Sequence, residues 1–464
     1  MSERKTGTLD KVFKLKENKT NMRTEITAGL TTFMTMAYIL AVNPSILADA
    51  GMDPTAVLLA TCLASFIGCV CMAFMANLPF VLSAGMGLNA YFAYTVVENM
   101  GVPWQTALFA VFIEGIIFII LSLTKVREAI FNSIPMQLKN AVSVGIGLYI
   151  AFIGLQSAGL CIDSERTLVT IIGFSSDFHT SGICALLAVI GTMLMAILYI
   201  KRVKGSILIG ILATWLLGIV CQLIGLYVPN AELGYYSLYP TFGFTDFTKL
   251  GETFGQCFNL DFGGFQIYDL IDLFVIVLAF LFVDLFDTLG TVIGVSTKAN
   301  MLDEEGKLPG LRQALLADAI ATSAGALLGT STTTTFVESS AGVAVGGRTG
   351  LTSLFAGLLF LIAMFLAPFF TAIPSFATAP ALIIVGFLMF TNITSMKFSE
   401  EDYATAIPAY LCIIAMPLFY SISEGISIGI ISYVLLNLVC GKAKKISPVM
   451  YVLAVLFILK YIFL

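Results

Sequence analysis

Long apolar segments alternate with short polar breaks along almost the whole chain. Each segment is about 20 residues long, which is the length that a helix needs to cross the hydrocarbon core of a bilayer. A polar loop, 229–268, divides the segments into two sets, and a last apolar stretch, 446–464, either crosses the membrane or lies along its surface. We therefore expect an all-α polytopic membrane protein with about fourteen transmembrane segments. The spans are expected near 26–43, 56–76, 80–98, 105–124, 140–158, 181–200 and 205–228, and then near 270–295, 314–329, 333–348, 351–371, 379–394, 405–420 and 423–440.

Basic residues gather in the predicted loops that fall on the same side as the N-terminus. These loops include 125–128, 201–204 and 441–445, whereas the loop 229–268 contains a single basic residue, Lys249. Cytoplasmic loops of membrane proteins are enriched in lysine and arginine. The pattern predicts a multi-pass protein of the cell membrane with a cytoplasmic N-terminus and with the loop 229–268 outside the cell.

An odd number of spans in each half gives the two halves opposite orientations, which is the geometry of an inverted repeat. In such transporters the substrate site lies near the bilayer midplane, where interrupted spans from the two halves meet. The third span of the first half is broken by Pro79, Gly85 and Gly87, and the third span of the second half is the hydroxyl- and glycine-rich stretch 329–350. The two interrupted spans match in position, so we expect the site between them.

The threonine run in the stretch 329–350 predicts a strand. Four β-branched residues in succession, 332–335, favour extended backbone over helix. We expect short strands near Phe80–Ser83 and Thr333–Phe336 to pair across the repeat axis, because extended backbone at membrane depth must be covered. Each strand then leads into a half-helix, starting near Gly85 and near Glu338. Threonines bonded back to helix carbonyls are the alternative, but that alternative leaves the intramembrane acid Glu338 unexplained.

A second acidic cluster lies in the eighth span, which reads LFVDLFDTLGTVIG. Asp284 and Asp287 share one flank of the expected helix, and Thr291 follows Asp287 by one turn. Gly290 and Gly294 have the spacing of a close helix-packing pair. Asp287 is either a site residue or an acid solvated near a helix end, and Asp284 either serves the site or pairs internally. Acids inside membrane spans commonly mark substrate or ion pathways.

The composition narrows the classes of function. Charged residues make up 11% of the chain, less than half of the roughly 25% that is typical of soluble domains. The one histidine, His179, lies in a predicted loop, and the nine cysteines lack the spacing of a metal site. We therefore expect no metal and no cofactor, and a membrane enzyme is disfavoured because no catalytic constellation can be assembled.

Three stretches of the chain resemble one known family. They read SAGMGLNAYF, FVDLFDTLGTVIGVSTKAN and GTSTTTTFVESSAGVAVGGRTGL. They are similar to the AzgA-like branch of the nucleobase–cation symporter 2 superfamily, also called the nucleobase–ascorbate transporters, and the similarity runs along essentially the whole chain. The resemblance implies a purine permease that imports hypoxanthine, guanine or adenine with protons as the coupling ion, by an elevator-like movement of a core domain against a gate domain.

The resemblance also implies a division of the chain into segments. Spans 1–4 and 8–11 would form the core domain, and spans 5–7 and 12–14 would form the gate domain. The expected segments are a cytoplasmic lead at 1–25, core spans at 26–124, gate spans at 125–228, an extracellular loop at 229–268, core spans at 269–371, gate spans at 372–445 and a C-terminal hydrophobic segment at 446–464.

The motifs carry expected roles for individual residues. In this family the acid of the eighth span, here Asp287, holds the base by its ring N–H groups. The acid of the tenth span, here Glu338, follows an aromatic residue and backbone amides that contact the base, here Phe336 and Val337. From the third span we expect Gly85, Met86 and Asn89 to contact the substrate as well.

Proton coupling is expected of Asp287, Glu338 and Asp284, and Thr291, Thr335 and Gly290 are expected to support helices around the site. The uracil branch of the superfamily has a histidine one turn after its eighth-span acid, where this chain has Thr291. A proton relay based on histidine is therefore not expected here, and His179 cannot replace it.

Two other functions remain open. A transporter of uracil or xanthine would share this architecture. An anion carrier would also use paired half-helices, whose N-termini attract negative charge, although two carboxylates at the site would repel an anion. The expected partners are a purine base and the lipid bilayer, with no nucleic acid. Members of the family are often homodimers through the gate domain, but no residue pattern here indicates a dimer.

Overall fold

The chain folds into a bundle of apolar helices, and the expectation of a polytopic helical membrane protein is confirmed. The computed structural model describes residues 8–124, 133–164, 167–175, 177–230, 235–240, 243–260, 267–298, 301, 308–398 and 402–463. Within these residues, ten helices are long and apolar enough to cross a membrane. The predicted basic loop 125–128 lies outside the described residues, as do residues 1–7 of the N-terminal lead.

The first half of the chain contains the spans up to the loop 229–268. Its first span consists of two helices, α2 and α3, and its third span is interrupted. The elements are α1 (Thr8–Phe13), α2 (Met22–Met36), α3 (Ile39–Asp49), α4 (Pro54–Cys71), β1 (Leu82–Ala84), α5 (Met86–Ala90), α6 (Trp104–Thr124), α8 (Met136–Ser157), β2 (Cys161–Ser164), β3 (Leu168–Ile171), α9 (Ile183–Ile200) and α10 (Ser206–Leu223), with π-helical turns at Met72–Ala76, Tyr91–Asn99 and Phe178–Gly182.

The second half repeats this arrangement with an interrupted tenth span. In the loop 229–268, before the second half begins, short 3₁₀ turns occupy Phe247–Glu252 and Gln256–Phe258. The elements are α11 (Ile267–Lys298), α12 (Leu311–Leu328), β4 (Thr333–Thr335), α13 (Ser339–Val345), α14 (Gly350–Ala363), α15 (Ala367–Thr371), α16 (Ser375–Phe390), α17 (Tyr403–Leu418), α18 (Ile422–Val439) and α19 (Pro448–Phe463).

The predicted pairing of two short strands is confirmed. Strand β1 of the third span pairs antiparallel with β4 of the tenth, with Ser83 opposite Thr334. Each strand leads directly into a short helix, α5 after Gly85 and α13 after Glu338. The two interrupted spans therefore meet in the interior of the bundle. A second small sheet, β2 with β3, was not predicted and forms a hairpin beyond α8.

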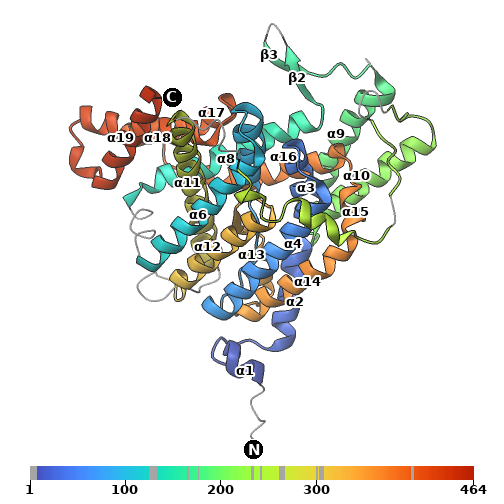
Figure 1. The fold of residues 1–464 in the computed structure, drawn as a ribbon, viewed down its shortest axis with the longest axis horizontal. Helices are drawn as coiled ribbons and strands as arrows, with labels where there is room; N and C mark the ends of the chain where they lie inside the picture. Colours follow the sequence, from blue (N-terminus) through green and yellow to red (C-terminus); the bar gives the residue numbers. More distant parts are fainter. Residues whose placement is uncertain are drawn as a thin grey trace, which may run out of the picture.

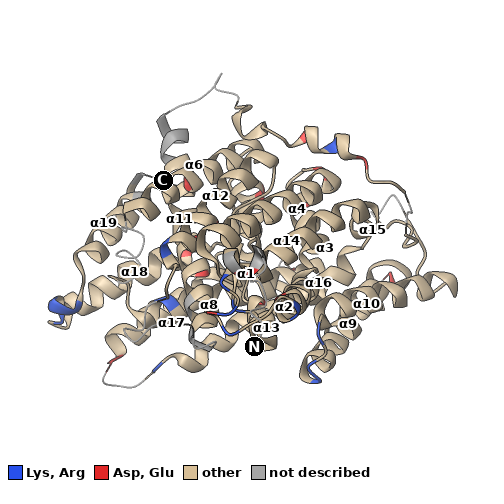
Figure 2. Cartoon of the chain, turned by 90° about the horizontal axis from the view of Figure 1, so that it is seen from below, with Lys and Arg blue, Asp and Glu red and all other residues tan. Residues whose placement is uncertain are grey.

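The helices form two groups. Helices α2, α4 and α6 pack with α12, α13 and α14 around the paired strands, whereas α8 packs with α16, α17 and α18, and α9 and α10 pack with α16. Figure 1 shows α9 and α10 at one side of the bundle and α17 to α19 at the other, with the strand-bearing group between them. Viewed from the side of the N-terminus, charged residues are sparse along the helices and basic residues stand at helix ends (Figure 2).

The apolar C-terminal segment is helical and packs against the rest of the bundle. Helix α19 contacts α18. The ring of Phe457 lies 5.8 Å from that of Phe282 on α11, and the Tyr461 hydroxyl donates to the Glu424 carboxylate on α18.

Candidate functional site

The two acids that the sequence singled out lie close together beside the paired strands. Asp287 of α11 accepts a hydrogen bond from Thr334 of β4 and lies near enough to Glu338 for their charges to interact. Glu338, at the start of α13, accepts a hydrogen bond of 2.7 Å from the Tyr38 hydroxyl. Both residues are half-buried as a whole. The structure thus gathers two acids from different spans at one partly accessible point.

The threonine run is held in extended form by bonds to the surrounding helices. The Thr332 hydroxyl donates to Glu114 of α6 at 2.7 Å, and the Thr333 carbonyl accepts from Thr322 of α12 at 3.0 Å. All four threonines are buried. Because strands inside a membrane need every backbone polar group covered, these side-chain bonds and the β1–β4 ladder explain why a strand is stable here.

The third span brings its expected residues to the same strands. A Cβ at Gly85 would lie 2.9 Å from the Thr334 hydroxyl, so only glycine allows this close approach. Met86 and Asn89 are buried, and the Asn89 carbonyl oxygen accepts from Ser331. The Asn89 amide nitrogen is buried without a hydrogen-bond partner among the described residues. A buried donor without a partner is rare in proteins, and it leaves a polar group available near the strands.

Phe336 and Val337 occupy different environments. Phe336 is buried, and its backbone N–H donates to the Val81 carbonyl at 3.0 Å, which extends the ladder. Val337 is 47% exposed. Val337 therefore stands at the open edge of the site, and Phe336 stands in its wall.

Asp284 belongs to a separate, fully buried cluster. The Thr288 hydroxyl lies 3.0 Å from a carboxylate oxygen of Asp284 and 3.0 Å from one of Asp318 on α12. One hydroxyl proton can serve only one of the two carboxylates in this bridge. Of the two alternatives for Asp284, the geometry favours internal pairing over contact with a substrate.

The glycines of α11 do not pack as expected. No atom of the described chain lies within 4 Å of a Cβ built at Gly290 or at Gly294, and both residues are exposed. The close helix packing expected at this pair is therefore not seen among the described residues, which leave open space next to Asp287. Thr291 is half-buried on this stretch. Thr335, expected to support a helix, lies in strand β4, and its hydroxyl has no partner among the described residues.

The sequence analysis did not select several polar residues that hold the helices and strands around the site. Asp318 and Glu114 are lone acids in apolar spans, so the same criterion that selected Glu338 was sufficient to find them. Tyr38 gave no signal, because a tyrosine in an apolar segment is indistinguishable from a packing residue before its partner is known.

Comparison with known proteins agrees with this architecture. A family model described as the permease family matches residues 23–457. The guanine/hypoxanthine permease PbuG of Bacillus subtilis is 44% identical over 462 residues, which cover 97% of this chain and 99% of that protein. The adenine permease AdeP of Escherichia coli is 40% identical over 459 residues, which cover 99% of this chain and 97% of that protein.

A solved structure shares the fold at low sequence identity. The transmembrane domain of the bicarbonate transporter BicA from a cyanobacterium superposes with a TM-score of 0.62 at 15% identity, covering 87% of this chain and 97% of that one. This likeness concerns the fold alone. The family match over almost the full length indicates a transporter rather than an enzyme. The chain belongs to the permease family, within the nucleobase–cation symporter 2 superfamily that its motifs resemble.

Proposed function

We propose that this protein imports purine nucleobases, with hypoxanthine and guanine as the favoured substrates and adenine as a further one, by proton symport. The observation that carries the proposal is the convergence of two acids from different spans. Asp287 of the eighth span and Glu338 of the tenth span lie close together, and both residues are half-buried. Relatives described as guanine/hypoxanthine and adenine permeases align along nearly the whole chain, which supports this class of substrate.

The chemistry of the site suits a flat, neutral base. A carboxylate can accept hydrogen bonds from two adjacent ring N–H groups, which a purine presents on its edge. Phe336 supplies an aromatic surface in the wall of the site, and Met86 and Asn89 approach from the other repeat. Small-molecule sites commonly combine an apolar wall with a few convergent polar groups.

Proton coupling follows from holding two acids together in a poorly solvated place. Two negative charges that interact at short range cannot both be held at low cost. Binding one proton relieves the repulsion between Asp287 and Glu338 and leaves one carboxylate to accept from the base. In this proposal the protonated, base-loaded site is the form that moves.

We assign the movement to the two groups of helices. The strand-bearing group of α2–α6 and α11–α15 serves as the core and the group of α8–α10 and α16–α18 serves as the gate. Access in this conformation supports the assignment: Val337 and Gly290 are exposed beside the acids. At the opposite end of the seam, Tyr94 donates to Asp49 at 2.8 Å, and its ring meets that of Tyr420 edge to face.

The proposed orientation puts the N-terminus and the exposed edge of the site in the cytoplasm, so this conformation releases substrate inward. We place the protein in the cell membrane on the same argument, because basic residues at helix ends mark the cytoplasmic side. A homodimer through the gate remains part of the proposal.

The alternative with a specific observation behind it is an anion carrier, because the fold is shared with a bicarbonate transporter. The acids at the site oppose it, since a carboxylate pair repels an anion. Transport of uracil or xanthine is the nearer alternative, because the same acids can accept from those bases.

Uptake of a panel of radiolabelled bases and bicarbonate into cells that lack their own purine permeases tests the proposal. We expect concentrative uptake of hypoxanthine and guanine that falls as external pH rises, because the inward proton gradient shrinks, and that collapses with a protonophore. Uptake that ignores the protonophore and requires sodium would refute proton symport. Uptake of uracil or bicarbonate in place of purines would refute the substrate assignment.

A further inference from the structure

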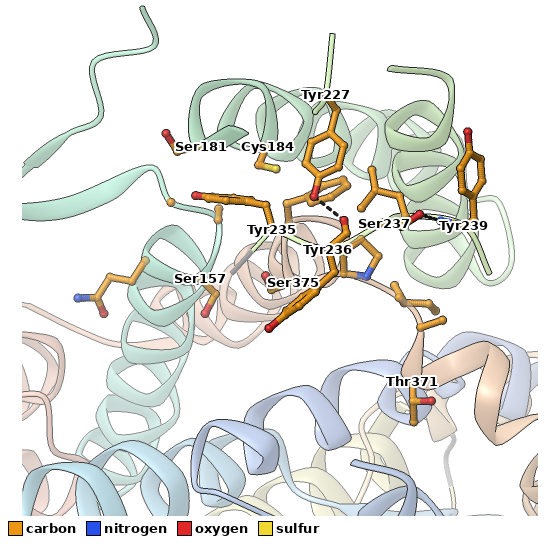
Figure 3. A pocket seen from close by; sticks show the side chains of 18 residues that line it. Ser157, Ser181, Cys184, Tyr227, Tyr235, Tyr236, Ser237, Tyr239, Thr371 and Ser375 are labelled. Carbon is orange, nitrogen blue, oxygen red and sulfur yellow. Dashed lines mark hydrogen bonds between the residues drawn. The ribbon is translucent and has the colours of Figure 1, made fainter. Parts of the chain in front are cut away.

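A cavity of about 530 Å³ lies in the helix group that we assign to the gate. It is bounded by the C-terminal end of α8, the start of α9, the chain that follows α10 and the start of α16. Figure 3 shows Tyr227, Tyr235 and Tyr236 around this cavity, together with Ser157 and Ser375. In the proposed orientation it opens to the outside of the cell.

The lining is aromatic and uncharged. Four tyrosines contribute to it: Tyr227, Tyr235, Tyr236 and Tyr239. Four serines add hydroxyl groups, and none of the described residues that line the cavity carries an acidic or basic side chain. The Tyr227 hydroxyl donates to the Tyr236 carbonyl at 2.6 Å, which ties the chain after α10 across the cavity. The volume falls in the range of small-molecule sites, roughly 300–1,000 Å³.

One lining residue has an unmet hydrogen-bond requirement. Gln156, at the end of α8, is half-buried, and its side-chain oxygen is buried with no partner among the described residues. A buried acceptor without a donor is costly, so a ligand with an N–H group would stabilise it. Stacking surfaces of tyrosine, hydroxyl groups and a free acceptor together suit a flat, neutral heterocycle with ring N–H groups. The described lining residues offer an anion or a nucleotide no cationic side chain.

The cavity leads to the seam between the two helix groups. A smaller cavity of about 150 Å³ shares Ser157 and Ser375 with it and reaches Asp49 of α3 and Tyr94 of the third span. Tyr94 and Tyr149, whose rings both contact that of Tyr420, close the seam below this point. The tyrosine-lined cavity therefore stands at the outer end of the route by which a substrate would reach Asp287 and Glu338.

We propose that this cavity, which we call the vestibule, binds the nucleobase from outside the cell before the seam opens. The vestibule site is separate from the carboxylate pair, and its recognition differs: it relies on stacking and neutral hydrogen bonds, so it is expected to be less selective among bases. The inference rests on the proposed function for the identity of its ligand.

The fluorescence of Trp215 can report binding in the vestibule, because this side chain contacts a residue of the cavity wall. The Trp215 indole donates to the Leu238 carbonyl at 2.8 Å, and Leu238 lines the cavity. The sequence contains two tryptophans, so Trp104→Phe leaves Trp215 as the single emitter. Hypoxanthine is titrated into the purified full-length Trp104→Phe protein while the Trp215 emission is recorded. We expect a saturable change.

Two further variants separate the vestibule from the central site. In the double variant Asp287→Asn/Glu338→Gln the Trp215 response is expected to persist, although uptake is lost. In Tyr235→Ala the response is expected to weaken by about 2- to 10-fold in affinity, the loss of one stacking contact. Tyr199→Ala is the matched control, because Tyr199 is exposed on α9 and does not line the cavity. Its response should equal that of the parent protein.

A Trp215 response that disappears in the double variant, or that Tyr235→Ala leaves unchanged, would overturn the vestibule site. Uptake provides a second measurement that needs no tryptophan variant: Tyr235→Ala should raise the KM for hypoxanthine with little change in maximal rate, and an unchanged KM would contradict the proposal. Hypoxanthine uptake without any Trp215 response refutes the vestibule and leaves the proposed function intact. A Trp215 response in a protein that transports no purine refutes the proposed function instead.

Discussion

Replacing Glu338 by glutamine tests the carboxylate pair most directly. Glutamine keeps the size of the side chain and keeps an oxygen that can accept from the Tyr38 hydroxyl, now 2.7 Å from the carboxylate. The fold around β4 and α13 should therefore survive. What disappears is the negative charge, and with it a charge-assisted acceptor for the base.

The size of the effect follows from this difference. A hydrogen bond to a charged group contributes about 1.5–3 kcal/mol, which corresponds to a loss of about 10- to 100-fold in affinity. The assay is equilibrium binding of radiolabelled hypoxanthine to the purified Glu338→Gln protein at a fixed pH. Because the vestibule is expected to bind the base as well, binding to two sites is measured together. The tighter component, which unlabelled hypoxanthine displaces, is the one that we assign to the carboxylate pair.

Glu424→Gln is the matched control. Glu424 is another acid in an apolar span, but it lies on α18 and contacts Tyr461 of α19. Its replacement should leave the tight component of hypoxanthine binding within about twofold, a change of roughly 0.4 kcal/mol by the usual conversion. Unchanged hypoxanthine binding in Glu338→Gln would refute the role of Glu338 in substrate recognition.

Three further predictions concern neighbouring positions. Asp287→Asn should abolish accumulation against a gradient while some exchange of purine survives, and protonophore-sensitive accumulation by this variant would exclude Asp287 from coupling. A cysteine at Val337, which is 47% exposed, should react with a small thiol reagent and be protected by hypoxanthine, whereas one at the buried Thr334 should be inert; equal labelling of both would contradict the site geometry. Gly85→Ala should lower the free energy of unfolding by about 1–3 kcal/mol through overpacking, because its Cβ would lie 2.9 Å from Thr334. Gly290→Ala meets no neighbour among the described residues and should unfold at or slightly above the temperature of the parent protein, because alanine favours a helix over glycine.

Much of the fold could be predicted from the sequence because membranes restrict the choices. Backbone at membrane depth must be helical or covered, so a run of β-branched residues between apolar spans had few possible structures. The pairing of β1 with β4 was therefore within reach of the sequence. The register was not predicted: β1 begins at Leu82, two residues later than expected, and the ladder sets Ala84 opposite Thr333.

The sequence could not predict in the same way which residues contact each other between helices. Gly290 and Gly294 have the spacing of a helix-packing pair, yet the described residues leave open space beside them. A spacing rule states which residues share a face of a helix, and it does not state what that face meets. Here the face adjoins Asp287, so the small residues leave room next to an acid. The hydroxyl of Tyr38 was hidden for the same reason, because its partner Glu338 is three hundred positions away in sequence.

The bundle contains two pairs of acids in different environments: Asp287 with Glu338, and Asp284 with Asp318. Asp287 and Glu338 are half-buried and near each other, so a substrate or a proton from outside can change their state. Asp284 and Asp318 are fully buried, and a single hydroxyl, that of Thr288, lies 3.0 Å from both. A hydroxyl has one proton to donate, so at this bridge one acid accepts from Thr288 and the other satisfies the hydroxyl oxygen best when it carries a proton of its own. Because α11 carries Asp284 and Asp287 on one flank, the buried bridge fixes the rotation of that helix and thereby fixes where Asp287 stands relative to β4. The buried cluster around Thr288 thus helps to position Asp287, the acid that we propose binds the substrate.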